Sequence, residues 1–133
     1  MKALLATACG SFIALSAYAD TSQPHLTGNQ VLEYCEAAGD EAKQGFCVGY
    51  VVGVVEGMRW GAAVPLLRTE GPGPHLDSMV NTILSFCLPD GATWGQYRDV
   101  IVRYLRENPQ SRHASARLLG QLALVESFPC PSP

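Results

Sequence analysis

Residues 45–61 read "GFCVGYVVGVVEGMRWG", with a glycine at every fourth position: Gly45, Gly49, Gly53, Gly57 and Gly61. Four residues of an α-helix turn through about 400°, so these glycines form one slowly winding stripe. Each glycine costs about 0.5–1 kcal/mol relative to alanine in a helix interior, and close packing of a second helix would offset that cost. We therefore expect a buried central helix over about 44–62, crossed closely by a neighbour. A dimer seam is the alternative.

This stretch is apolar, but it does not fit a membrane span. The uninterrupted apolar run "FCVGYVVGVV" covers residues 46–55, and Glu56 and Arg59 follow it closely. A transmembrane helix needs about 20 predominantly apolar residues. The pattern thus favours a helix inside a soluble domain.

The first 19 residues have the features of a secretory signal peptide. Lys2 gives a positive start, "ALLATACGSFIAL" is apolar, and "AYA" at 17–19 is a small-x-small cleavage site. We expect cleavage after Ala19, export to the periplasm, and a mature chain of residues 20–133 that forms a single helical domain.

The charge of the chain excludes some classes of partner. Nine Lys and Arg residues stand against twelve Asp and Glu residues, which gives a net charge of −3. An acidic domain without a basic patch is a poor candidate for binding nucleic acid or an anionic membrane.

Four cysteines remain after the signal peptide: Cys35, Cys47, Cys87 and Cys130. An even number in a small exported domain predicts two disulfides. No C-x-x-C and no paired-histidine spacing occurs, so we expect no metal site. Antiparallel helical hairpins favour Cys35–Cys47 with Cys87–Cys130, and Cys35–Cys130 with Cys47–Cys87 stays open.

The rest of the chain also reads as helical. "LTGNQV" predicts a helix start, because Thr27 can cap the helix and Gln30 can return the hydrogen bond. Pro65 and the run 69–75 predict a loop, and a short helix follows it. An amphipathic helix begins after Thr93 and ends at Asn108-Pro109.

A last helix, over about 113–128, is expected to bury one apolar face, made up of Leu118, Leu119, Leu122 and Val125. No strand alternation is evident. The predicted fold is all-α, a compact bundle of about four main helices stapled by two disulfides.

Motifs of enzymes are missing from the sequence. No G-x-S-x-G, P-loop, H-E-x-x-H or dinucleotide fingerprint occurs, and His25, His75 and His113 lie in separate segments. We expect no catalytic residues and no cofactor. The charged loop "RENPQSRH" at 106–113 lies between two well-formed helices, where recognition residues are often found.

Three segments in order resemble the Rap/Tai family of immunity proteins associated with type VI secretion. They are "GNQVLEYC", "FCVGYVVGVVEG" and "FCLPDGATWGQYRDVIVRYLRENPQSRHASARLLGQLALVESFPC". The resemblance runs from about Thr27 to Cys130. The chain departs from the family at Ser115, where members often carry proline.

The resemblance implies a periplasmic immunity protein that binds and inhibits a peptidoglycan amidase effector by inserting a loop into its active-site groove. The amidase is a cysteine–histidine peptidase, so the immunity protein needs no catalytic group, and some members form homodimers. The partner-binding residues would be those of the 106–113 loop: Arg106, Glu107, Asn108, Pro109, Gln110, Ser111, Arg112 and His113. A small periplasmic structural or chaperone-like helical protein without a toxin partner is the alternative.

Overall fold

A computed structural model describes residues 25–131 of the chain, and the expected signal peptide lies outside these residues. The described part contains five α-helices and one 3₁₀ turn: α1 (Gly28–Cys35), α2 (Glu41–Thr69), α3 (Leu76–Leu84), α4 (Trp94–Glu107), η1 (Pro109–Ser111) and α5 (Ala116–Ser127). The β pairing seen within residues 25–131 is an isolated bridge between Thr27 and Ser115. The all-α prediction is confirmed.

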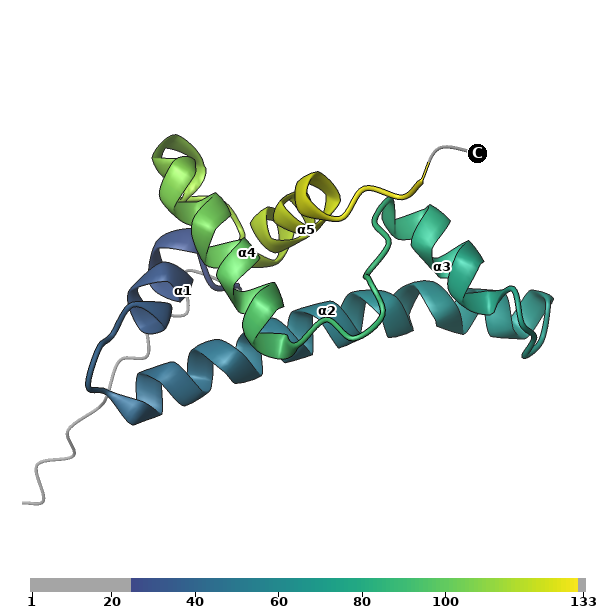
Figure 1. The fold of residues 1–133 in the computed structure, drawn as a ribbon, viewed down its shortest axis with the longest axis horizontal. Helices are drawn as coiled ribbons and strands as arrows, with labels where there is room; N and C mark the ends of the chain where they lie inside the picture. The colour runs from purple at the N-terminus through teal and green to yellow at the C-terminus, as the bar shows by residue number, and fades with distance from the viewer. Residues whose placement is uncertain (1–24, 132–133) are drawn as a thin grey trace, which may run out of the picture.

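The long helix α2 organises the molecule. At 29 residues it is about 44 Å long. In Figure 1, α1, α4 and α5 lie on one side of α2, and α3 packs against its C-terminal part. No helix among residues 25–131 has both the length and the apolar character needed to cross a membrane.

The helix α2 is longer than the predicted 44–62, and the loop expected at Pro65 is wrong. Asp40 caps its start by accepting a hydrogen bond from the amide of Lys43 at 3.0 Å. Pro65 lies inside the helix. Proline removes the hydrogen bond to the carbonyl four residues earlier, here that of Gly61. Both Gly61 and Pro65 are exposed, so solvent can satisfy that carbonyl.

The glycine stripe was expected to lie against a neighbouring helix, and this expectation is wrong. The five glycines are exposed, and a Cβ added at any of them meets no described atom within 4 Å. The packed side of α2 instead carries Cys47, Val51 and Val55. These stand two positions away from the glycines, and two residues turn a helix by about 200°. The glycines therefore face away from the core.

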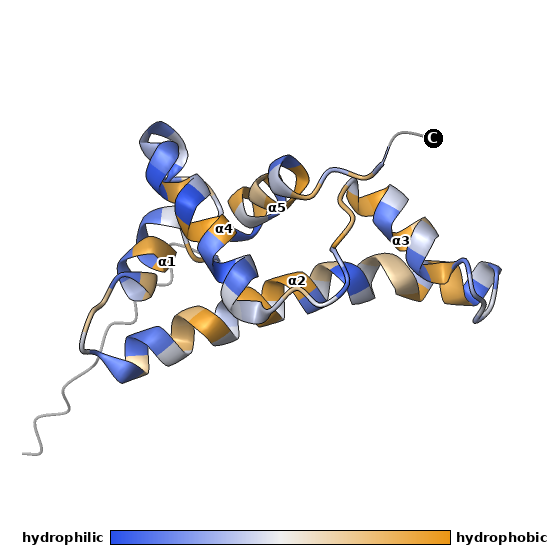
Figure 2. Ribbon diagram, in the orientation of Figure 1, coloured by the Kyte–Doolittle hydropathy of each residue, from blue (hydrophilic) through white to orange (hydrophobic). Residues whose placement is uncertain are grey.

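The core lies along α2, where α1, α3, α4 and α5 all pack against this helix. Its largest fully buried side chains are apolar and include Phe86, Leu105, Leu124, Val31, Val51, Val55 and Val80. Figure 2 shows hydrophobic residues recurring along α2, whereas α4 is banded in blue and orange. The amphipathic pattern predicted for α4 is thus confirmed, with Tyr97, Ile101 and Leu105 inward.

The last helix differs from its prediction in start and in orientation. The helix α5 begins at Ala116 rather than 113. Leu118 and Leu122 were expected to point inward, but 51% and 42% of these residues are exposed. The buried side carries small residues such as Gly120, where an added Cβ would lie 3.6 Å from Ile101 of α4 and 3.7 Å from Val54 of α2. Small residues let α5 approach α4 and α2, and the two leucines fall on the outer side.

Both disulfides have the pairing that the hairpin argument favours. Cys35 is bonded to Cys47, which joins the end of α1 to α2, and Cys87 is bonded to Cys130. The alternative pairing is wrong. Residues 62–69 continue α2, and α3 folds back only along the C-terminal part of that helix, far from Cys47 near its start.

Candidate functional site

The candidate site is the connection between α4 and α5. Thr93 caps the start of α4, because its hydroxyl accepts a hydrogen bond from the amide of Gln96 at 3.2 Å. It ends at Asn108, because the residue before a proline resists helical geometry. The Asn108 side chain donates to the carbonyl of Tyr104 at 2.9 Å. The chain then forms the 3₁₀ turn η1.

Arg112 turns back onto the end of α4. Its guanidinium donates to the backbone carbonyl of Leu105 and, at 2.9 Å, to that of Arg106. These carbonyls belong to the last turn of α4, where helical partners are missing and a positive charge is favourable. Arg112 therefore serves the loop's own structure.

The N-terminus of α1 holds the other side of the loop. The amide of Asn29 donates to the carbonyl of Arg112 at 3.0 Å, and that of Gly28 donates to the carbonyl of Ala114 at 3.1 Å. Thr27 and Gln30 form the predicted capping box, which is confirmed. The loop backbone is thus tied to two helices.

Gly28 makes this contact possible, and sequence reasoning did not single it out. A Cβ at Gly28 would lie 2.7 Å from a methyl carbon of Leu119, 2.9 Å from one of Leu105 and 3.1 Å from the carbonyl oxygen of Arg112. The absence of a side chain at Gly28 thus allows the close approach of α1 to the loop, and a larger residue would displace these neighbours. A glycine at the first position of a capped helix was the available signal.

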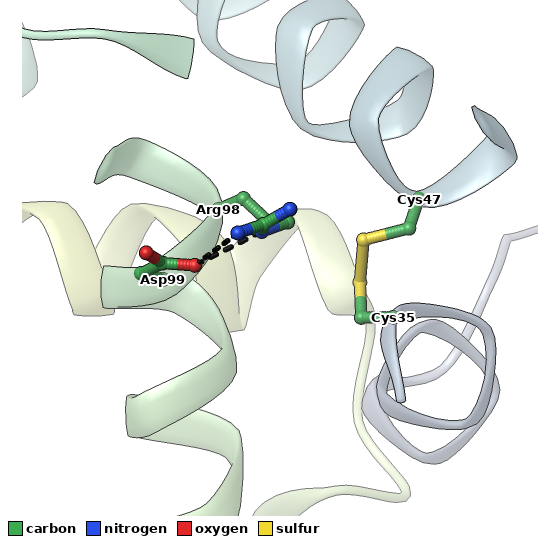
Figure 3. The surroundings of a disulfide bond; sticks show 4 residues. All are labelled: Cys35, Cys47, Arg98 and Asp99. Carbon is green, nitrogen blue, oxygen red and sulfur yellow. Dashed lines mark hydrogen bonds and ion pairs between the residues drawn. A yellow bond between two sulfur atoms is a disulfide. The ribbon is translucent and has the colours of Figure 1, made fainter. Parts of the chain in front are cut away.

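A second attachment lies at the base of the loop. Arg106 forms an ion pair with Glu36, which directly follows Cys35 at the end of α1. Figure 3 shows the adjoining Cys35–Cys47 disulfide, with Arg98 of α4 extending toward it and bound to Asp99. An open cavity of about 350 Å³ lies between these elements. Its two arginines are matched by two carboxylates, so it holds no unbalanced charge.

The structure divides the predicted partner-binding residues into two groups. Asn108, Ser111 and Arg112 are partly buried, and two of them cap α4. The exposed residues of the loop are Arg106, Glu107, Pro109, Gln110 and His113. The loop therefore presents acidic, basic and amide groups from a fixed backbone.

Three ionisable groups elsewhere have displaced pKa values. The hydrogen bond from Lys43 to Glu33, 3.0 Å long, raises the pKa of Lys43 and links α2 to α1. Burial raises the pKa of Tyr50 and of Tyr97. Across residues 25–131, no group of three or more His, Cys, Asp or Glu side chains is placed to hold a metal ion.

A family model described as Rap1a immunity proteins matches residues 27–130, from the capping residue of α1 to the last disulfide cysteine. No curated protein and no solved structure shows significant similarity to the chain. Because the family match covers most of the chain, the protein belongs to the Rap1a immunity proteins, a family whose role implies binding to a protein effector.

Proposed function

We propose that this immunity protein acts in the periplasm, where it binds a peptidoglycan amidase delivered by type VI secretion and plugs its active-site groove with the 106–113 loop. The family match supports the immunity role. The observation that carries the choice of surface is the anchored loop, whose exposed residues include Glu107, Gln110 and His113. The proposal also includes a homodimer, which the family resemblance implies.

A fixed loop suits a plug for a physical reason. Ordering flexible side chains and loops on binding costs free energy, and a preorganised loop avoids much of that cost. Here α1 and Arg112 already hold the backbone in the free protein. Inhibition by such a loop is steric, because it excludes the peptide substrate from the groove and needs no reactive group of its own.

The periplasmic location rests on the N-terminal sequence and on the disulfides. Disulfides persist in oxidising compartments such as the bacterial periplasm. We expect the protein recovered from a periplasmic extract to begin at Asp20. Deletion of residues 2–19 should abolish protection against a periplasmic amidase. Equal protection by the deleted form would contradict the location.

The test of the inhibitory role is coexpression with a candidate amidase directed to the periplasm. The amidase alone should lyse the cells, and coexpression of this protein should prevent lysis and give a complex on sizing. Gln110→Lys and His113→Glu should each weaken the complex at least tenfold, as expected for central contacts of an interface.

Glu70→Lys is the matched control, because Glu70 is exposed at the far end of α2 from the loop. It should leave both protection and the complex unchanged. The inhibitory role toward that amidase would be contradicted if the wild-type protein neither prevented lysis nor formed a complex. If the loop variants bound the amidase as tightly as the wild type, the interface would have to lie outside the 106–113 loop.

A further inference from the structure

A second open cavity lies at the opposite end of α4 from the candidate loop. Its volume is about 450 Å³, and its walls come from α2, α3, the start of α4 and the segment between α3 and α4. Figure 1 shows this segment returning from α3 across α2 to the start of α4. Cavities of about 300–1,000 Å³ are typical of small-molecule sites. The helix α4 has 14 residues and is about 21 Å long, so this cavity is separate from the 106–113 loop.

The walls of this cavity carry an excess of negative charge. Its charged side chains are the carboxylates of Glu56, Asp77 and Asp90 and the guanidinium of Arg59. Arg59 donates to Asp77 at 3.0 Å and to Asn81 at 2.9 Å, so it is held against α3 and balances one carboxylate. Glu56 and Asp90 are exposed and form no ion pair with another described residue. A ligand that balances these charges is a cation.

The phenol of Tyr97 supplies a polar group inside the same cavity. Tyr97 lines the cavity although only 6% of the residue is exposed, and its hydroxyl forms no hydrogen bond within residues 25–131. Burial raises the pKa of Tyr97, and the charge of Arg59 lowers it while that of Glu56 raises it. The hydroxyl therefore lies toward these two charged groups of the cavity. Because buried polar groups are nearly always hydrogen-bonded, this hydroxyl points to a ligand with a donor.

The ring of Trp94 adds an aromatic wall. Trp94 is 39% exposed, and its ring stands edge-on to that of Tyr97, with 5.5 Å between the centroids. Tryptophan is the aromatic residue that attracts an organic cation most strongly. A metal ion fits less well, because no three or more His, Cys, Asp or Glu side chains in the described part of the chain are placed to hold one.

We propose that this cavity binds an organic cation through its alkylammonium group. The carboxylates of Glu56 and Asp90 balance the charge, and the hydroxyl of Tyr97 accepts one of the three ammonium hydrogens. The ring of Trp94 covers the ammonium, and Leu88 contacts the alkyl chain. A free amine and the side chain of a lysine in another protein present the same group, and the experiment distinguishes these two sources.

The test titrates the mature protein with two probes that carry this group. Cadaverine represents a free amine, and Nα-acetyl-lysine methylamide represents a lysine side chain. The readout is the indole N–H signal of Trp94 in NMR spectra, which a Trp60→Phe variant distinguishes from that of Trp60. We expect a saturable shift, and the probe with the lower dissociation constant identifies the source. Nα-acetyl-norleucine methylamide lacks the charge and should cause no shift.

Matched variants locate the site. Tyr97→Phe keeps the buried ring and removes the hydroxyl, and Asp90→Asn removes the charge of an exposed residue, so neither should change the circular dichroism spectrum. Each should raise the dissociation constant about tenfold, as expected for the loss of a hydrogen bond or ion pair to a charged group. Glu126→Gln removes an exposed carboxylate outside the cavity and should leave the dissociation constant unchanged.

The proposal would be overturned if neither amine shifted the Trp94 signal at about 10 mM, a concentration that reveals even millimolar affinity. An equal shift with the norleucine compound would overturn it too. So would equal weakening by Asp90→Asn and Glu126→Gln, because the attraction would then come from the net charge of the protein, and unchanged binding by Tyr97→Phe. These measurements contain no amidase, so this site and the inhibitory role can fail separately.

Discussion

Gly28 and Gly53 are both helical glycines without a positive φ, but their surroundings differ. At Gly28 a single added carbon would meet three atoms at 3.1 Å or less, whereas at Gly53 it would meet nothing within 4 Å. Gly28 lets α1 pack closely against the loop of the candidate site, a contact that lies within one chain. Gly53 has no such role within residues 25–131, because its outer side faces open space. The same residue type thus occupies one tightly packed position and one open position of the fold.

The largest losses of stability should come from removal of the disulfides, because each closes a loop of the unfolded chain. The Cys35–Cys47 bond also holds α1, the helix whose Gly28 contacts the loop of the candidate site. Cys35 and Cys47 are 12 residues apart, and Cys87 and Cys130 are 43 apart. Loop-closure entropy predicts losses of about 3 and about 4 kcal/mol when the pairs are replaced by alanine. Chemical denaturation of each double variant measures these losses.

Hydrogen exchange separates the two disulfides further. Loss of Cys35–Cys47 should expose the amides of Gly28 and Asn29, because α1 is then held less firmly against the loop. Loss of Cys87–Cys130 should affect the amide of Cys87, which donates to Phe128 at 2.9 Å. Equal protection from exchange at residues 28–29 in both variants would show that the contact between α1 and the loop does not depend on the Cys35–Cys47 disulfide.

The next effect addresses the two glycines directly. Gly28→Val should destabilise the fold by about 1–3 kcal/mol, because overpacking forces Leu119 and Leu105 to move. Gly53→Val places the same side chain in open space and should change the free energy of unfolding by less than about 0.5 kcal/mol. Denaturation at a concentration where the protein is monomeric checks both values. Similar losses at the two positions would remove the distinction.

Arg112, which holds the loop against the end of α4, should have a smaller effect on stability. Arg112→Gln removes hydrogen bonds from a charged group to the carbonyls of Leu105 and Arg106, and such bonds contribute about 1.5–3 kcal/mol. We expect a loss toward the lower end, because Arg112 is partly exposed. Arg103→Gln, whose exposed side chain bonds Ser127, is the control. A difference of less than about 0.5 kcal/mol between the two variants would show that the loop does not need this cap.

The sequence predicted the elements whose signals are local. The capping box of Thr27, the cap of Thr93 and the stop at Asn108-Pro109 depend on neighbouring residues, and all three are confirmed. The disulfide pairing followed from hairpins of such elements. The dimer, the periplasmic location and the partner-binding role of the loop stay predictions.

The failures concern packing between distant segments. Periodicity showed that α2 has an apolar character all round, but it could not show which side faces the core, because valines and glycines alternate two residues apart. Leu118 and Leu122 were placed inward on hydrophobicity alone, whereas the small residues of α5 give the closer fit against α4 and α2. The sequence also could not show that Arg112 caps α4 while Gln110 stays exposed, because both outcomes depend on contacts between distant segments.

A small gain in stability is expected at Ser115, where the resembling family often carries proline. The φ of Ser115 is −57°, within the range that proline fixes at about −65°. The hydrogen bonds that join this segment to residues 26–28 are donated by Gly28 and Ala116, so proline at 115 removes none of them. The Ser115 hydroxyl is also buried without a partner among the described residues.

Ser115→Pro should therefore raise the free energy of unfolding by about 0.4–1 kcal/mol, because it restricts the unfolded chain. Ser115→Ala separates the contribution of the buried hydroxyl from that of the proline ring. Thermal unfolding of the three proteins measures both. A loss of stability in the proline variant alone would mean that Ala114 cannot take the extended geometry that a following proline demands. The contact between α1 and the loop, in which Gly28 donates to the carbonyl of Ala114, would then depend on the conformation of Ala114.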